Sequence, residues 1–428
     1  MLDPAYLDAL RAICQPIRAG DYPHTLQPMR DLLAALGNPE RRFPAVVVAG
    51  SVGKGTTCHH IARLFRAAGL RTGLYTSPHL HLFRERFVLD GEMISYEAFM
   101  EGVRVIQEAA RRLNHRYSTF EQATALALWW YAQQEVDIAV LEIGMGGRWD
   151  AVNAVPNVLA VLTPIETEHV DILGGSLQSI VWQKAGIIAA RGQAITGRQT
   201  GDVFAILQNE ADHRHAVLHR VDAGEEAGQE EAAALLAFGV YRNLAEREIV
   251  PRRRLQLDAS FTGLPGRLER LQVAGRAVLL DGAHTPGGAW ALRLVIHGIM
   301  GRSRPVRLVA GMLQDKAARK FLSVFDAPRF HIVLTQAPSH RAAPPEELWA
   351  QVDLRQAEVE IIPDLQEALA EVHSASEGLF VVTGSLRMIA AAREAYGLLS
   401  PEELEEARAT REIFDGPDYL ARLDAKTP

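Results

Sequence analysis

The sequence predicts an α/β fold in two domains, each with a mostly parallel sheet flanked by helices. Strand-like apolar runs alternate with amphipathic stretches along the chain, which is typical of parallel strands joined by helices. The 428 residues are too many for one ordinary hydrophobic core. Glycine and proline at residues 263–266 interrupt the pattern. We therefore expect one domain at residues 1–262 and a second at residues 263–428.

Strands and helices alternate in the expected first domain. Its candidate strands are the apolar runs at residues 45–49, 73–76, 137–142 and 158–163. Helical patterns separate them, at residues 56–68, 96–113 and 122–134. A segment rich in alanine and glutamate, residues 223–248, is expected to form the helix that closes this domain.

A second series of strands follows the interruption. These strands are expected at residues 277–281, 306–310, 331–335 and 379–383, with helices between them. In both series, the residues that could carry chemistry follow the C-terminal end of a strand. Ligands bind at that edge in open α/β sheets, so we expect the functional site there.

Composition excludes several classes of protein. The chain is 48% hydrophobic and 23% charged, as in ordinary globular proteins, and its net charge of −7 argues against a general nucleic-acid binder. We interpret the arginines at residues 252–254 as solvated surface. The two cysteines, Cys14 and Cys58, cannot form a disulfide framework or an all-cysteine metal site. No signal-peptide pattern and no membrane-spanning apolar stretch is present, so we expect a cytoplasmic enzyme without a membrane partner.

The segment GSVGKGTT at residues 50–57 has the character of a phosphate-binding loop. Glycines let backbone N–H groups point at phosphate oxygens, the following helix adds its positive dipole end, and Lys54 adds a charge. It is not a strict Walker A motif, because Val48 stands where that motif has its first glycine and Gly55 follows the lysine. The combination of strand, glycines, lysine, threonines and helix favours phosphate binding over an ordinary glycine-containing turn.

Candidate metal ligands follow the next two strands. Glu142 ends a strand and precedes a glycine-rich turn, which suits a Mg²⁺ ligand near a triphosphate, because Mg²⁺ takes one or two carboxylates plus phosphates and water. His169, considered alone, is more typical of a structural or surface histidine. Lys184 lies at the end of a predicted helix, where a lysine is ordinarily a solvated cap.

The second domain offers Arg267 at its start and Asp281 at the end of its first strand. Arg267 could hold a phosphate or stack on a base. Asp281 could bind a ribose or a metal, or it could form an Asx turn before a helix begun by Pro286. The residues leave both interpretations of Asp281 open.

Taken in order, these segments closely resemble the folylpolyglutamate synthase/dihydrofolate synthase family of the Mur ligase superfamily. The matching stretches lie at residues 50–57, 76–80, 119–121, 142–153, 169–174, 184–187, 264–267, 281–284 and 311–316. The sequence Ser77-Pro78-His79-Leu80 favours folate ligases over other Mur-type enzymes. The resemblance implies an N-terminal P-loop ATPase-like domain and a smaller C-terminal Rossmann-like domain.

The resemblance also implies roles for individual residues. ATP would be held by residues of both domains, namely Gly53, Lys54, Gly55, Thr56, Arg267, Asp281 and His284. Two Mg²⁺ ions are implied, one bound by Ser77 and Glu142 and the other by His169. Lys184 would be carbamylated and, with Lys54 and His169, would serve catalysis. The pterin-side pocket would be lined by Ser118, Thr119, Phe120, Glu121, Trp149, Asp150 and Ala151.

The implied reaction joins small molecules in a monomeric enzyme. A pteroate or folate carboxylate would attack the γ-phosphate of ATP, and the amino group of L-glutamate would then attack the resulting acyl phosphate. The sequence departs from the family at Val52, Glu168, Glu231 and Thr285. It leaves open whether dihydropteroate, folates or both are substrates. A Mur-type ligase for a non-folate carboxylate and a nucleotide-binding switch without turnover are the competing hypotheses.

Overall fold

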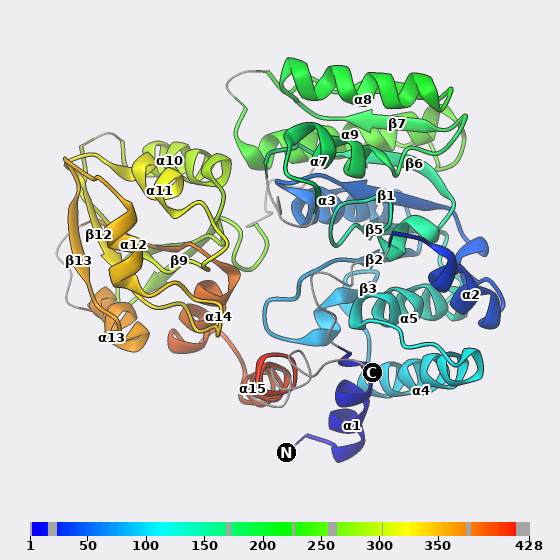
Figure 1. Ribbon diagram of the computed structural model, residues 1–428, viewed down its shortest axis with the longest axis horizontal. Coiled ribbons are helices and arrows are strands. Elements are labelled where there is room, and N and C mark those ends of the chain that lie inside the picture. The colour runs from blue at the N-terminus through cyan, green and yellow to red at the C-terminus, as the bar shows by residue number, and fades with distance from the viewer. Residues whose placement is uncertain are drawn as a thin grey trace. The chain divides into compact units, whose positions relative to one another are not determined.

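The computed structural model describes residues 2–15, 24–167, 173–224, 227–255, 263–301, 303–373 and 378–416. Contacts divide the chain into two compact units, residues 1–257 with 406–428, and residues 258–405. Each unit contains its own sheet covered by helices (Figure 1), so the predicted α/β fold class is confirmed. The sequence placed every residue after 262 in one domain, whereas the contacts return the end of the chain to the first unit.

The sheet of the first unit has, within the described residues, the strand order β4-β3-β2-β5-β1-β6-β7-β8. The strands are β1 (Ala45–Ala49), β2 (Thr72–Tyr75), β3 (Phe87–Leu89), β4 (Glu92–Met93), β5 (Ile138–Glu142), β6 (Asn157–Leu162), β7 (Gln193–Thr196) and β8 (Val217–Arg220). All neighbours pair in parallel except at β3 and β4. The four strands expected from sequence correspond to β1, β2, β5 and β6. The strands β3, β4, β7 and β8 were not predicted, because their sequences are short or partly polar.

The helices of this unit cover both faces of the sheet (Figure 1). They are α1 (Pro4–Ile13), α2 (Gln27–Ala35), α3 (Lys54–Ala67), α4 (Tyr96–Leu113), α5 (Thr119–Gln133), α7 (Leu177–Ala185), α8 (Gly201–His213) and α9 (Gln229–Glu246), with the 3₁₀ turns η2 (Pro39–Arg41), η3 (Phe83–Arg86) and η4 (Ala151–Ala154). In β1, Val46 and Val48 pack with residues of α3 and α9, while Val47 packs into the core on the other face. This alternation follows from the two-residue period of a strand, and the burial of both faces is typical of a parallel sheet.

The second unit has the strand order β13-β12-β11-β14-β10-β9 in its described part, parallel except for β9. The strands are β9 (Glu269–Val273), β10 (Arg276–Leu280), β11 (Val306–Ala310), β12 (Phe330–Leu334), β13 (Glu358–Ile361) and β14 (Leu379–Thr383). The helices are α10 (Pro286–Met300), α11 (Ala318–Leu322), α12 (Pro345–Gln351), α13 (Leu365–Ala370) and α14 (Leu386–Ala395), with η5 (Ser323–Phe325) and η6 (Glu371–His373). The arrangement is the expected Rossmann-like sheet. No helix in the described ranges of either unit is both long and apolar enough for a membrane span.

The last helix, α15 (Pro401–Asp415), is anchored to the first unit by a buried ion pair. The Glu406 carboxylate is fully buried and accepts hydrogen bonds from Arg84 Nη2 at 2.8 Å and from Tyr6 Oη at 2.5 Å. Further along the helix, the Phe414 ring stacks on Phe83 with the centroids 4.7 Å apart. These contacts hold η3, and they explain why the end of the chain belongs with the first unit.

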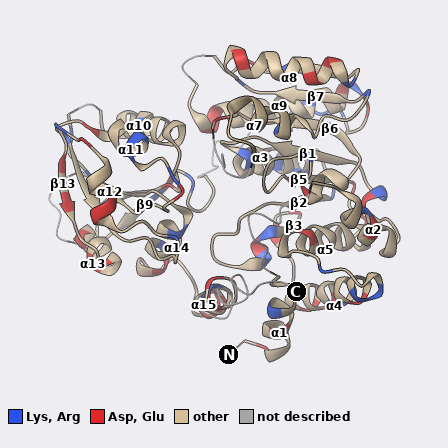
Figure 2. Cartoon of the chain, viewed as in Figure 1, with Lys and Arg blue, Asp and Glu red and all other residues tan. Residues whose placement is uncertain are grey.

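We expect Glu406→Ala to destabilise the first unit by about 3–5 kcal/mol, because it leaves the buried Arg84 guanidinium without its carboxylate. Urea unfolding of the full chain measures this effect. The control is Glu101→Ala on α4, a helix that carries both acidic and basic residues (Figure 2) and where Glu101 pairs with Arg104 in solvent. This control should change the midpoint little. Equal midpoints for the two variants would contradict the prediction.

Candidate functional site

The C-terminal ends of three neighbouring parallel strands form the edge of the sheet where the functional site was predicted. Gly50 follows β1, Glu142 ends β5, and Thr163 follows β6. Val48 is in register with Glu142, and Ala49 is in register with Leu162. The chain leaves β1 between β5 and β6, which is the kind of position where open α/β sheets bind ligands. The structure therefore places the phosphate loop, Glu142 and the start of the segment after β6 at one edge of the sheet.

The phosphate loop depends on two glycines with positive φ angles, Gly50 at 147° and Gly53 at 78°. A Cβ atom on Gly50 would lie 1.9 Å from Thr163 Oγ1 and 2.9 Å from the Thr163 carbonyl oxygen. The backbone N–H groups of Ser51 and Val52 donate to the Pro164 carbonyl at 2.9 and 3.1 Å. The loop thus rests directly on the segment after β6, which only glycine at position 50 allows.

Helix α3 begins at Lys54, immediately after the loop. The first N–H groups of a helix have no intrahelical acceptor, so those of Lys54, Gly55 and Thr56 are available to an anion. These three residues, with Gly53, are the ones predicted to hold ATP phosphates. Their backbone geometry fits that role.

Two lysines share one carbonyl oxygen beside the loop. Lys54 Nζ donates to the Gly50 carbonyl at 3.1 Å, and Lys184 Nζ donates to the same oxygen at 2.8 Å. Lys184 is 2% exposed, so the interpretation of this residue as a solvated helix cap is wrong. The structure instead places both nitrogens at the phosphate loop.

Lys184 reaches the loop because two glycines allow close packing around the end of α7. A Cβ atom on Gly147 would lie 3.1 Å from Lys184 Cα, and one on Gly186 would lie 2.4 Å from Arg148 Cβ. The Arg148 N–H donates to the Gln183 carbonyl at 2.7 Å. The glycine-rich turn after Glu142 therefore positions the helix end that carries Lys184.

Glu142 faces the start of α3. Its side chain is buried, and its Oε2 atom accepts a hydrogen bond from the Ser77 N–H at 3.0 Å. The same oxygen lies 3.7 Å from the position a Cβ on Gly55 would take. A carboxylate beside a phosphate loop, with a serine next to it, fits Mg²⁺, which prefers oxygen ligands and takes few from the protein when phosphates are present. The described residues contain no cluster of three or more His, Cys, Asp or Glu suited to a metal.

His169, predicted as a catalytic residue and second metal ligand, lies outside the described residues. So does Glu168.

The residues predicted to line the pterin side mostly support local structure. Ser118 and Glu121 form a capping box at the start of α5, and Thr119 Oγ1 accepts a hydrogen bond from the Gln15 N–H at 2.8 Å. Phe120 differs, because its ring lies 2.6 Å from the position a Cβ on Gly144 would take. Phe120 therefore packs onto the turn that follows Glu142, at the edge of the site.

Asp150 organises that same turn. Its carboxylate accepts N–H hydrogen bonds from Gly144 at 3.1 Å, from Met145 at 3.0 Å and from Val152 at 3.0 Å. Burial raises the pKa of Asp150 to about 7, although the N–H donors act in the opposite direction. Trp149 is half-buried before it, and Ala151 is buried after it at the start of η4.

In the second unit, Asp281 lies at the end of β10, as predicted. Its carboxylate accepts N–H hydrogen bonds from Ala283 and Leu268, both at 2.9 Å. The first of these is the Asx turn that the sequence left open, and Thr285 caps the helix begun by Pro286. Burial raises the pKa of Asp281, and the Arg267 charge opposes this, so the two predicted residues are neighbours.

His284, the third predicted residue of this unit, has its Nδ1 atom 2.9 Å from the Gly282 carbonyl oxygen. The turn after β10 thus holds Asp281 and His284 from the nucleotide-binding prediction, and Arg267, which precedes β9, lies near Asp281.

Three residues in or beside the phosphate loop were not among the predicted site residues. Ser51 Oγ lies 3.0 Å from the Glu166 N–H that donates to it, and Thr163 fills the space opposite Gly50. The Gln229 amide nitrogen lies 3.8 Å from the position a Cβ on Gly53 would take. Ser51 and Thr163 could have been found from their places in the loop and after β6. Gln229 lies in a helix that the sequence identified only as closing the domain.

Known proteins resemble this chain in sequence and in fold. The Mur ligase middle domain matches residues 48–264, and the Mur ligase glutamate ligase domain matches residues 266–386. Folylpolyglutamate synthase of Lacticaseibacillus casei is 29% identical, over 85% of this chain and 92% of its own length. Dihydrofolate synthase/folylpolyglutamate synthase of Mycobacterium tuberculosis is 31% identical, over 86% of this chain and 88% of its own. The structure of Mycobacterium tuberculosis folylpolyglutamate synthase complexed with ADP has a TM-score of 0.78 at 28% identity, covering 92% of this chain and 98% of that one.

Proposed function

Because this chain belongs to the folylpolyglutamate synthase/dihydrofolate synthase family of Mur ligases, we propose that it joins L-glutamate to dihydropteroate, to a reduced folate or to both. The enzyme is an ATP-dependent acid–amino-acid ligase. The observation that carries the proposal is the convergence of Lys54, Lys184 and Glu142 on the phosphate loop.

The first step is phosphoryl transfer. An oxygen of the substrate carboxylate attacks the γ-phosphorus of ATP, and the bond from that phosphorus to the ADP oxygen breaks. The N–H groups at the start of α3 hold the phosphates, and the Lys54 ammonium opposes the negative charge on the transferred group. Glu142 and Ser77 would hold Mg²⁺, which neutralises phosphate charge when it is bound.

The second step forms the amide. The glutamate amino nitrogen attacks the carbonyl carbon of the acyl phosphate, the carbon–oxygen bond to phosphate breaks, and the nitrogen loses a proton. Phe120 packs on the turn held by Asp150, and we propose that both orient the acyl group on the pterin side of the pocket. We retain Arg267, Asp281 and His284 as proposed nucleotide contacts.

We propose that Lys184 acts as a carbamate. Its Nζ and Lys54 Nζ donate to one oxygen, so two ammonium groups would repel one another at short range, and the Lys184 side chain is buried. Reaction of the neutral Lys184 amine with CO₂ gives a carbamate and one released proton. The side chain then attracts Lys54 and offers oxygen atoms to a cation.

Phosphate release should require an acceptor and glutamate together. We expect release from ATP with dihydropteroate or tetrahydrofolate only when L-glutamate is present, and little with either compound alone. The measurement is phosphate release over this matrix of substrates, with mass spectrometry of the products. If another carboxylate supports turnover and no pteroate or folate does, the enzyme is a Mur-type ligase that acts on a different substrate. A monomeric, cytoplasmic enzyme remains part of the proposal.

A further inference from the structure

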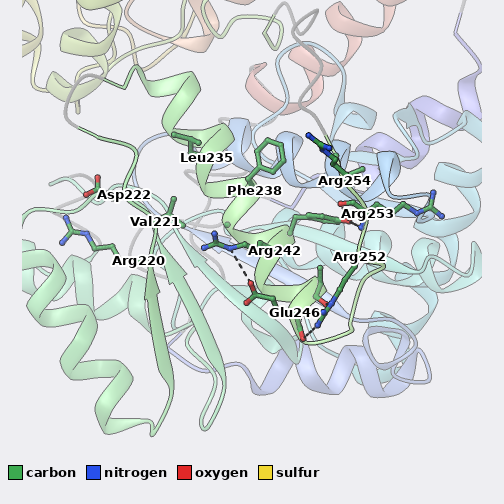
Figure 3. A pocket seen from close by; sticks show the side chains of 14 residues that line it. Arg220, Val221, Asp222, Leu235, Phe238, Arg242, Glu246, Arg252, Arg253 and Arg254 are labelled. Carbon is green, nitrogen blue, oxygen red and sulfur yellow. Dashed lines mark hydrogen bonds and ion pairs between the residues drawn. The ribbon is translucent and has the colours of Figure 1, made fainter.

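A basic groove of about 740 Å³ lies in the first unit, and no residue assigned to the reaction lines it. Arginines reach it from the end of β8, from the second half of α9 and from residues 252–254 (Figure 3). We propose that this groove binds an oligo-γ-glutamate chain, the acidic peptide that repeated turnover would build on a folate. The inference rests on the proposed function for the identity of the peptide.

Positive charge dominates the groove. Five arginines line it, against the carboxylates of Asp222 and Glu246. In the described lining, Arg242 and Glu246 form an ion pair, with their atoms 3.8 Å apart and both side chains largely exposed. Exposed pairs at such distances are weak, so Glu246 does little to neutralise Arg242. This excess of cations stands out in a chain whose net charge is −7.

The arginines at residues 252–254 are held in place by α9. The Tyr241 hydroxyl donates to the Pro251 carbonyl at 2.6 Å and accepts from the Arg253 N–H at 2.9 Å. Arg252 donates through Nε to the Ala245 carbonyl at 3.0 Å. A segment fixed in this way presents its charges with less loss of conformational entropy on binding. The three side chains are exposed, as expected from the sequence, and these contacts order the backbone that carries them.

The wall of the groove is apolar. Leu235 is 38% exposed, and Phe238 and Val221 lie with it in the lining. A Cβ on Gly239 would lie 2.5 Å from Val221 Cγ2, so this glycine lets α9 approach the strand end closely.

An apolar wall with separated arginines suits a ligand that alternates methylene groups and carboxylates, as a γ-linked glutamate chain does. Guanidinium groups pair well with carboxylates. A single phosphate would instead need donors that converge on one point. Nucleic acid would need a more extended basic face than one groove.

The test is calorimetric titration of the full chain with γ-linked pentaglutamate, in the absence of ATP. Arg242→Gln combined with Arg254→Gln removes two groove charges at exposed positions. We expect the double variant to bind the peptide about tenfold more weakly than the unaltered protein. Added salt should also weaken binding of the peptide to the unaltered protein. The matched control is Arg104→Gln with Arg112→Gln on α4, which makes the same change in net charge and should bind normally.

Several results would overturn the inference. They are no binding of the peptide, equal weakening in the control, or displacement of the peptide by inorganic phosphate or ADP at equal concentration. If the natural ligand of the groove is the chain of the folate product, a folate that carries this chain should bind at least as tightly as the free peptide. Phosphate release with a monoglutamyl folate should be unchanged in the groove variant, so failure of the groove and failure of the ligase proposal give different results.

Discussion

Lys184→Ala should lower kcat by about a hundredfold or more, which corresponds to at least ~2.7 kcal/mol of transition-state stabilisation. The substitution removes a buried group that contacts the carbonyl of the phosphate loop. If that group is a carbamate, the variant also loses an anion beside Lys54. Steady-state phosphate release with saturating substrates measures the effect.

Rescue of activity by small carboxylic acids distinguishes a carbamate at Lys184 from a lysine with a purely structural role. Acetate should partly restore the turnover of Lys184→Ala, because the cavity left by the side chain admits an anion. It should not restore Lys184→Met, whose side chain fills the same space. With ¹³C-bicarbonate, the unaltered protein should show a carbamate carbon signal by NMR that both variants lack. Near-normal turnover of Lys184→Ala, or no such signal in the active enzyme, would refute the carbamate.

Gly50→Ala should abolish most turnover, again by about a hundredfold or more. A Cβ there would overlap Thr163 Oγ1 at 1.9 Å, and the φ angle of 147° disfavours any residue with a side chain. Either residue 50 or Thr163 must shift to relieve the overlap, and a shift of residue 50 displaces the carbonyl that accepts from both lysines. Equilibrium binding of ADP and phosphate release together measure the loss.

Gly201→Ala is the matched control, because a Cβ at Gly201 meets no atom within 4 Å. It should leave turnover and stability nearly unchanged. Adding Thr163→Ala to Gly50→Ala should recover part of the activity, since it removes the side-chain overlap but leaves the Thr163 carbonyl at 2.9 Å. If Gly50→Ala binds ADP and turns over normally, the assignment of this loop to ATP phosphates fails.

The sequence by itself determined the central parallel strands of both sheets and the phosphate loop. The apolar run of β1 and the following GSVGKGTT segment are local patterns, and a few neighbouring residues specify a buried strand, a glycine turn and a helix start. Because parallel strands end at one edge, the sequence alone predicted that Glu142 lies beside the loop. The order of motifs likewise indicated the family.

Only the tertiary structure decided which distant side chains meet there. Lys184 contacts the Gly50 carbonyl across 134 residues of sequence, and Arg84 pairs with Glu406 across 322. Nothing in the local sequence of either residue specifies these contacts, because they depend on how α7 packs beside the phosphate loop and how α15 packs against α1 and η3. For the same reason, Lys184 considered alone seemed a solvated helix end, although the family resemblance implied a catalytic role for it, and the C-terminal helix seemed to belong to the second domain. Burial and long-range packing are properties of the assembled fold, and they assign each of these residues its environment.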